Sequence, residues 1–260
     1  MIEPSRTRVL VALDNGHPSS EALQQLAQLL DAESLELIGL YVEDENLRRA
    51  ARLPGLREIS LSGQELELSL ERIEADVARD LVRIRSGFEH TARALRLRCR
   101  FEVARGYIAE ALCAAATKSD FVLVSRTLRA SGLRGRSAPH FGPLVSQARR
   151  ILFVNEPWAS GKSVIVLGND PVAIATGRRL AEAESLELVV ALPHFSGAPR
   201  ELPPQATIAR LPDWSEDAIA NLCLRHDARL LIVAEGADLD TAALLTGLLD
   251  RLPCSLLKLA

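Results

Sequence analysis

Short hydrophobic runs alternate along the chain with stretches of helical periodicity. The run at 8–13 (RVLVAL) ends in turn-forming residues, and segment 20–33 then places its leucines on one helical face. Further apolar runs follow at 35–42 and 120–126. Continuous apolar strands separated by amphipathic helices are typical of a parallel sheet that is covered on both faces. The pattern therefore predicts an α/β fold with a doubly wound, Rossmann-like sheet.

The order of elements is repeated in the second half of the chain. The hexapeptide AESLEL occurs at 32–37 and again at 183–188. The first-half segments described above, together with 142–154, have counterparts at 163–168, 173–184, 186–193, 229–235 and 247–259. A duplication explains this repeat. We expect two five-stranded parallel sheets, one in a domain spanning 1–155 and one in a domain spanning 163–260, with the linker NEPWASGKS between them.

The two copies are unequal after their second strands. Segment 64–95 carries an apolar stripe at helical spacing, and a helix of that length would measure about 48 Å, with a bend or break expected near Gly87. The equivalent segment, 193–206, contains four prolines and no helical period. We therefore expect the second domain to lack one layer helix and to lean on the first domain or on a partner chain.

Composition and charge exclude several classes of protein. The chain is 48% hydrophobic and 25% charged, which is typical of a soluble globular protein. A net charge of −3 is too small to indicate nucleic acid as a partner. Residues 1–155 hold 22 basic and 20 acidic residues and the remainder holds 9 and 14, so the charge differs between the halves. No apolar run could span a membrane and no signal-peptide pattern begins the chain, so a cytoplasmic location without membrane insertion is expected.

The four cysteines are scattered, with no CxxC pair and no histidine at ligand spacing. We interpret them as small buried residues in a reducing compartment and expect no metal site.

A candidate ligand site follows from the predicted topology. In an open parallel sheet, ligands bind beyond the carboxyl ends of the strands, where the strand order reverses. Asp14 follows the first strand, Val42 ends the second, and the loop that begins at Ser125 and Arg126 follows the fourth. We therefore expect these residues to converge at one edge of the first sheet.

The loop after the fourth strand has the composition of an anion site. Residues 121–155 contain six arginines, Arg129 among them, and no acidic residue. Gly132 and Gly142 allow close approach of the backbone, and a helix is expected to start near Pro143. Backbone N–H groups, guanidinium groups and a helix N-terminus together suit a polyphosphate. The alternative is a solvated basic loop that keeps the domain soluble, and the two interpretations stay open.

These segments resemble the universal stress protein family. The resemblance rests on the opening VLVALDNG, the glycine-rich loop after the fourth strand and the closing GPLVSQARRILFV, with TGLLDRLPCSLLKL in the second half. Both units together cover nearly the whole chain, which therefore resembles a tandem universal stress protein. The resemblance implies that the two units pair within the chain as two subunits do in the family's usual homodimer. A homodimer of the whole chain is also expected, because of the free sheet edges and the missing helix.

Nucleotide-binding members of the family carry an Asp after the first strand and the loop pattern G-x2-G-x9-G-[S/T]. Asp14 matches the Asp, and Gly132 and Gly142 match the second and third glycines. The first glycine falls on Arg129 and the final Ser/Thr on Pro143, which has neither a hydroxyl nor an N–H for phosphate. Arg129 either replaces the backbone donors or fills the site. The second unit has Gly168 in place of the Asp and acids in its loop, so we interpret it as structural.

Three functions follow as hypotheses. The first is a non-catalytic stress-response regulator that binds one adenine nucleotide, ATP with Mg²⁺, in the first domain. The second is a nucleotide-free scaffold that acts on an unidentified protein partner. The third, a phosphotransfer or hydrolytic enzyme, would need an acidic metal-binding cluster near the loop, and none is visible. Segment 41–59 is predicted to be a surface loop with a short amphipathic helix, or a lid or docking segment.

Overall fold

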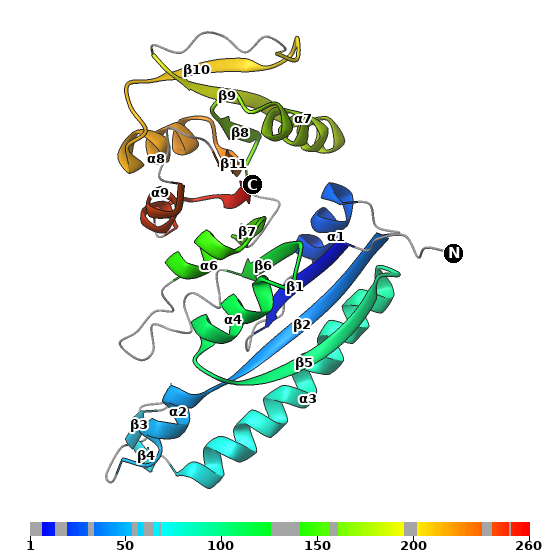
Figure 1. Cartoon of the computed structure of the whole chain (residues 1–260), viewed down its shortest axis with the longest axis vertical. Helices are drawn as coiled ribbons and strands as arrows, with labels where there is room; N and C mark the ends of the chain where they lie inside the picture. The colour runs from blue at the N-terminus through cyan, green and yellow to red at the C-terminus, as the bar shows by residue number, and fades with distance from the viewer. Residues whose placement is uncertain are drawn as a thin grey trace.

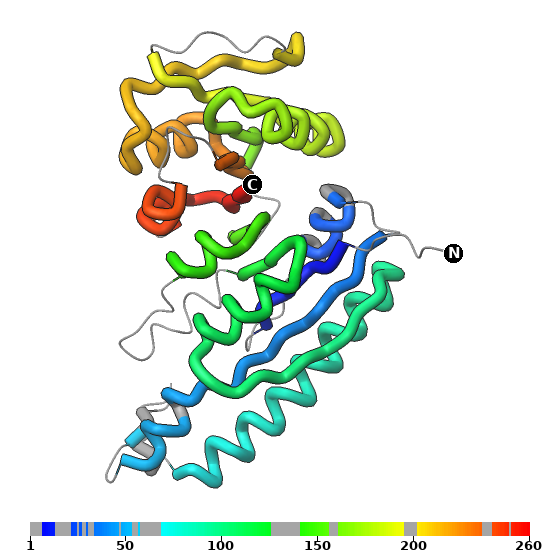
Figure 2. The backbone as a smooth tube through the Cα atoms, in the orientation of Figure 1, coloured from blue at the N-terminus to red at the C-terminus, as the bar shows by residue number. Residues whose placement is uncertain are grey.

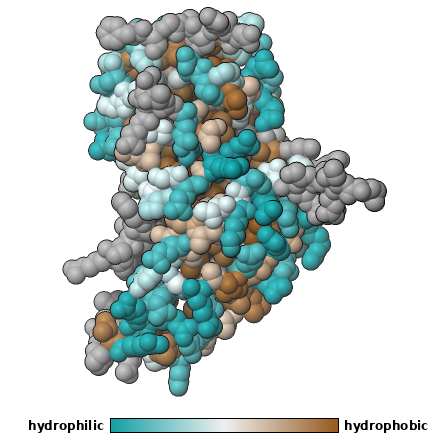
Figure 3. Space-filling model, in the orientation of Figure 1, coloured by the Kyte–Doolittle hydropathy of each residue, from teal (hydrophilic) through white to brown (hydrophobic). Residues whose placement is uncertain are grey.

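The computed structural model describes residues 7–13, 20–30, 34–53, 57–59, 65–67, 69–125, 141–155, 161–194, 202–235, 241–249 and 251–260. The molecule is elongated, with the first half of the chain at one end and the second half at the other (Figures 1 and 2). The last strand of each half lies in the middle. On the face drawn in Figure 3, hydrophobic side chains lie in small groups among hydrophilic ones.

The first half consists of alternating strands and helices, with a small hairpin inserted after its second strand. Its elements are β1 (Thr7–Leu13), α1 (Ser20–Leu29), β2 (Leu35–Asp44), α2 (Glu45–Ala50), β3 (Arg57–Ile59), β4 (Glu65–Glu67), α3 (Leu70–Ala94), β5 (Arg98–Gly106), α4 (Ile108–Ala116), β6 (Phe121–Ser125), α6 (Gly142–Gln147) and β7 (Ile151–Val154). Strands β6 and β7 are buried at every position, because helices cover both of their faces.

The second half has the same order of elements, except that its described residues include no counterpart of α2, of the hairpin β3–β4 or of α3. Its elements are β8 (Ser163–Leu167), α7 (Pro171–Glu184), β9 (Glu187–Pro193), β10 (Thr207–Leu211), α8 (Glu216–Arg225), β11 (Ala228–Ala234), α9 (Thr241–Leu248) and β12 (Ser255–Leu259). The predicted strands of both halves are thus present. The third strands, β5 and β10, are additions to the segments that the periodicity identified.

All ten main strands form one sheet, in the order β10-β9-β8-β11-β12-β7-β6-β1-β2-β5. Pairing is parallel within each half, and the halves meet at the antiparallel pair β12–β7. The predicted α/β, Rossmann-like fold is confirmed, and its two five-stranded parallel units are joined into one continuous sheet. Both β7 and β12 are buried throughout, so a free edge at either strand would expose unpaired backbone. The boundaries proposed for two separate domains stay a prediction.

The pairing of β12 with β7 follows a pseudo-two-fold axis. In the sequence repeat, Ile151 aligns with Leu256, Leu152 with Leu257 and Phe153 with Lys258. In the sheet, Leu257 pairs with Leu152, and Lys258 with Ile151. Equivalent residues of the two halves therefore have equivalent partners, as at the isologous interface of a symmetric dimer. The axis passes through the Leu152–Leu257 pair.

The repeated hexapeptide occupies the same register in both halves. Leu37, its last residue in the first half, pairs with Val9 of β1. Leu188, its last residue in the second half, pairs with Val164 of β8, which is the equivalent of Val9. The repeat in the sequence is therefore also a repeat in sheet geometry.

Two hydrophobic cores lie on opposite faces of the sheet. One is formed with α4, α6, α8 and α9, and the other with α1, α3 and α7. On the second face the first half contributes two helices, and the second half contributes α7 as its one described helix. None of the residues described between β9 and β10 is helical, and the expected loss of a layer helix there stays a prediction.

The long helix differs from its prediction in two respects. It begins at Leu70, because Ser69 caps its N-terminus by accepting a 3.2 Å hydrogen bond from the backbone N–H of Arg72. Residues 65–67, predicted to be helical, form β4 and pair with β3. The expectation of a break near Gly87 is wrong, since α3 continues to Ala94, and the alternative of a bend there stays a prediction. Buried Ile84 and Phe88 hold this part of the helix on the sheet.

None of the described helices is both long enough and apolar enough to cross a lipid bilayer.

Candidate functional site

The order of strands reverses at β1 in the first half. Strand β1 pairs with β2 on one side and with β6 on the other, and Ala12 pairs with Val124. Strand β1 ends at Leu13 and β6 at Ser125, so their carboxyl ends lie side by side. This is the location at which open α/β sheets bind ligands. The predicted site residues Asp14, Arg126, Arg129 and Gly132 lie outside the described residues.

Strands β2 and β5 extend beyond the end of β1 as a pair, residues 42–44 and 104–106, which we call the β2–β5 wall. Strand β2 pairs with β1 as far as Tyr41 and then continues, paired with β5 alone, to Asp44 and Gly106. Val42 lies on this extension and packs, half-buried, against the core on the α4 and α6 face. Ser125 is only 2% exposed and is the last residue of β6, so it lies at the base of the candidate site. The structure thus places Val42 and Ser125 at the same edge of the sheet.

The chain re-enters the described structure at Phe141, directly before α6. Phe141 is buried and packs edge-on against Phe153, with ring centroids 5.8 Å apart. Its carbonyl accepts a 2.8 Å hydrogen bond from the N–H of Val145, which starts the helix. Gly142 and Pro143 form the first turn, as predicted, and Pro143 is exposed. Because proline lacks an N–H, this turn offers one fewer donor to an anion.

The equivalent edge of the second half has a different chemistry. Gly168 follows β8 with φ of 88°, and its N–H donates to the carbonyl of Ala191 at 2.9 Å. Asp170 caps α7 by accepting a 2.8 Å hydrogen bond from Ala173 N–H. Glu235 follows β11, and its carboxylate lies 2.7 Å from Lys258 Nζ. Both carboxylates are therefore used within the fold.

Lys258 links the two halves. Its side chain is 2% exposed, and its Nζ donates to the carbonyls of Val145 at 2.9 Å and Ala148 at 3.0 Å. Both carbonyls belong to the C-terminal end of α6 in the other half, where a cation is favoured by the helix dipole. The sequence interpretation missed this residue. The available signal was a lysine within the buried strand SLLKL, at the position where the first copy has Phe153.

Comparison with solved structures agrees with this architecture. A universal stress protein from Archaeoglobus fulgidus DSM 4304 superimposes with a TM-score of 0.59 at 10% sequence identity, over 97% of this chain and 95% of that chain. A functionally unknown protein, PA1789 from Pseudomonas aeruginosa PAO1, gives a TM-score of 0.50 at 15% identity, over 98% and 92% of the two chains. The fold is that of the universal stress proteins, in tandem. No family model and no curated protein matches the sequence.

The first half carries a segment without a described counterpart in the second half, α2 with the hairpin β3–β4, at the far end of the β2–β5 pair (Figure 1). Two arginines of α2 attach this segment to its neighbours: Arg48 pairs with Glu74 of α3 at 2.9 Å, and Arg49 donates a 2.8 Å hydrogen bond to the hydroxyl of Tyr107, directly after β5. The short helix predicted within 41–59 is present as α2. Because α2 is bound to α3 and β5, these contacts hold it beside the wall, and its role as a lid or docking segment stays a hypothesis.

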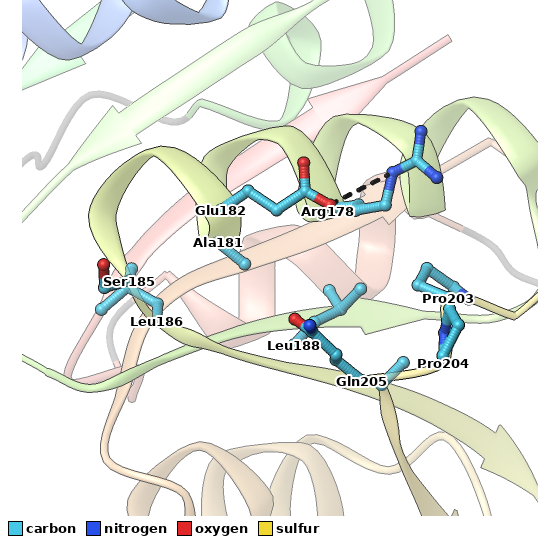
Figure 4. Close-up of a pocket in the computed structure, with 10 residues that line it drawn as sticks. Arg178, Ala181, Glu182, Ser185, Leu186, Leu188, Pro203, Pro204 and Gln205 are labelled. Atoms are coloured by element: carbon cyan, nitrogen blue, oxygen red, sulfur yellow. Dashed lines mark ion pairs between the residues drawn. The ribbon is translucent and has the colours of Figure 1, made fainter.

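A cavity of about 530 Å³ lies in the second half, between α7 and the turn before β10 (Figure 4). Its apolar lining includes Leu188, Pro203 and Pro204, and Arg178 and Glu182 on α7 form an ion pair of 3.8 Å beside it. The cavity opens at the amino ends of β9 and β10, away from the edge where this fold binds ligands. It lies on the sheet face that α3 covers in the first half, where α7 is the one helix among the described residues of the second half.

Neither thiol chemistry nor metal binding is indicated by the described residues. No three of their His, Cys, Asp or Glu side chains are grouped as metal ligands. Cys113, Cys223 and Cys254 are free and buried, and Cys99 is half-buried. The pKa of Cys223 is raised mainly by a hydrogen bond with the Cys254 thiol and to a smaller extent by burial. Burial also raises the pKa of Cys113 above its ordinary value.

The cysteines lead to a prediction about reactivity and pH. A thiol reagent at neutral pH should modify Cys223 only after unfolding, because a protonated buried thiol is a poor nucleophile. A thiol whose pKa is raised by folding stabilises the fold fully below its ordinary pKa and less as the pH rises above it. Stability should therefore fall as the pH rises above about 9. Counting thiols in native and denatured protein, with thermal melting across this pH range, checks both expectations.

Proposed function

We propose that this protein is a non-catalytic stress-response regulator that binds one adenine nucleotide in its first half. The carrying observation is the reversal of strand order at β1, where β1 and β6 end side by side below the β2–β5 wall. The likeness in fold to a universal stress protein supports the same assignment. So does the sequence that continues from this edge, because residues 126–140 contain four arginines, two glycines and no acidic residue.

The residues of this edge fit a nucleotide. Val42 supplies an apolar surface for the base, and Asp14, which follows β1 in the sequence, would accept a hydrogen bond from a nucleoside hydroxyl. Gly132, Gly142 and Arg129 would meet the phosphates through N–H and guanidinium donors. Mg²⁺ would accompany ATP and neutralise part of its phosphate charge. The second half has Gly168 in place of the Asp, and three acidic residues in its loop sequence 235–240 would repel phosphate, so one nucleotide per chain is proposed.

Pro143 favours a second candidate, a nucleotide-free scaffold. It occupies the first turn of α6, where the family pattern has a Ser or Thr, and supplies no N–H there. In this case the protein would act by contacts with an unidentified protein partner. We expect self-association in either case, because both outer strands of the sheet, β5 and β10, lack a described partner on one side.

Calorimetric titration with ATP and Mg²⁺ separates the two candidates. Two or three charge-assisted hydrogen bonds, each worth about 1.5–3 kcal/mol, should give a dissociation constant in the micromolar range. We expect one site per chain, and at least about tenfold weaker binding for Asp14→Ala and Arg129→Ala.

Asp76→Ala is the matched control for Asp14→Ala, since Asp76 lies on α3, away from the carboxyl ends of β1 and β6, and its described ion pair is with Arg79 of the same helix. It should bind as the wild type does. No heat at millimolar ATP, together with no co-purifying nucleotide, would favour the scaffold and reject the nucleotide site.

A further inference from the structure

Strand β5 forms one outer edge of the ten-stranded sheet (Figure 1). It spans nine residues, Arg98–Gly106, and pairs with β2 on its inner side. No described strand covers its outer side, so a row of backbone N–H and C=O groups is open there. Such an edge is a template for a further strand unless its side chains prevent pairing.

Apolar side chains gather at this edge on the α3 face of the sheet. Val103 is 46% exposed, although its neighbour two residues earlier, Phe101, is covered by the Arg85 guanidinium at 5.8 Å from the ring centroid. Val82 is 68% exposed and lies one turn before Arg85 on α3, which runs antiparallel to β5. Val82 is therefore on the same part of the edge as Val103. A second copy packed here would bury both side chains.

Charged side chains occupy the opposite face of β5. Arg98, Arg100 and Glu102 are exposed there, and Arg100 lies 3.2 Å from Glu102 and 4.0 Å from Glu36. Charges on an edge strand usually reject foreign strands. They admit a partner whose charges are complementary, because opposite charges on facing residues attract and like charges repel.

The sequence of β5 is complementary to itself in one antiparallel register. With Phe101 on a two-fold axis, Arg100 of each copy faces Glu102 of the other, and Arg98 faces Ala104. Moving the axis by one residue towards either end places Arg100 or Glu102 opposite itself. An axis at Cys99 places Arg98 opposite Arg100, and an axis at Val103 brings no opposite charges together. Only the Phe101 register has two attractive pairs and no like-charge pair.

We propose that two copies of this chain associate through β5 in an antiparallel pair centred on Phe101. The pair joins the two sheets edge to edge, with Arg100–Glu102 ion pairs on one face and Val82, Phe101 and Val103 on the other. This assigns a surface to the self-association proposed above and is independent of nucleotide binding.

Charge exchange tests the proposed register. Sedimentation velocity of the full chain should show a dimer at micromolar concentration. Arg100→Glu and Glu102→Arg should each weaken dimerisation by about tenfold or more, because each places like charges opposite one another. The double variant R100E/E102R should restore the dimer. Arg98→Glu is the matched control, with the same charge change on the same face, and should leave the dimer intact because its facing residue is Ala104.

Cross-linking tests the same register directly. The native Cys99 of one copy faces Val103 of the other, and facing residues have Cα atoms about 4.5–5.5 Å apart, within reach of a disulfide. Val103→Cys should therefore give a covalent dimer when dissolved oxygen and a copper catalyst oxidise the thiols, and Cys99→Ala added to it should abolish that product. A monomeric wild type, a dimer indifferent to the single exchanges, or a folded double variant that stays monomeric would overturn the proposal. Circular dichroism of each variant establishes that it is folded.

Discussion

Replacing Lys258 with methionine should lower the free energy of unfolding by about 2–4 kcal/mol. Methionine fills a similar volume but cannot donate, so the carbonyls of Val145 and Ala148 would lose their donor at the junction of the two halves. Each buried acceptor left without a partner costs about 1–3 kcal/mol. The ion pair with Glu235 contributes less, because the Glu235 side chain is 51% exposed and is screened by solvent.

Chemical denaturation measures this loss, with Lys162→Met as the control. Lys162 also pairs with an acid, Asp227 at 3.8 Å, but its side chain is 86% exposed. The control should therefore change the free energy of unfolding by no more than about 0.5 kcal/mol. Equal effects of the two substitutions would show that the contacts of Lys258 with α6 contribute no net stability.

Replacing Phe88 with alanine should cost about 3–5 kcal/mol. Phe88 is 1% exposed and lies on the face of α3 that contacts the sheet. Its ring occupies the space above Gly39 of β2, where an added Cβ would come within 2.7 Å of the ring, and it lies 6.5 Å from the ring of Phe101. Removing the ring would leave a cavity between α3, β2 and β5, since the rest of the helix cannot move inward without displacing its other contacts.

His90→Ala is the comparison variant for Phe88→Ala. It removes a ring from the same helix two residues further on, but at an exposed position. We expect a change within about 0.5 kcal/mol, measured by the same denaturation. A loss for Phe88→Ala no greater than this would mean that α3 is not anchored by its apolar stripe.

The two variants examine different consequences of one duplication. Phe88 belongs to a helix that the first half has and the described part of the second half lacks, and the cavity beside Leu188 is on the corresponding face. Lys258 replaces the residue equivalent to Phe153, so the junction is no longer symmetric in its side chains. The halves have therefore diverged both in their layers and at their interface.

Local sequence pattern determined most of the fold. The apolar runs predicted eight strands to within a few residues, because a strand covered on both faces must be hydrophobic at successive positions. The AESLEL repeat predicted a duplication, and its residues take the same register against β1 and β8. The same pattern placed the end of α3 well but not its start, because the stripe continues into β4, where Leu66 lies in a strand.

For the candidate site, the sequence predicted which segments meet at the edge of the first sheet. The paired strands that extend beside that edge became known only from the structure. The order of strands follows from short right-handed connections, so the meeting of β1 and β6 was predictable, as was the start of α6 near Pro143. The extension of β2 and β5 into a wall was not, because it depends on pairing between segments far apart in the chain.

Only the tertiary structure decided which edge strands of the two halves pair with each other. Periodicity records which face of a strand is buried, but it does not record which strand lies beside it. The union of two five-stranded units through β7 and β12 depends on two edges that are apolar on both faces and meet across a pseudo-two-fold axis. The two carbonyls that Lys258 contacts at α6 lie more than a hundred residues away, so the burial of its charge could be understood only once α6 was in place. The sequence by itself thus determined the elements and their repetition, and the packing of distant edges decided how they became one sheet.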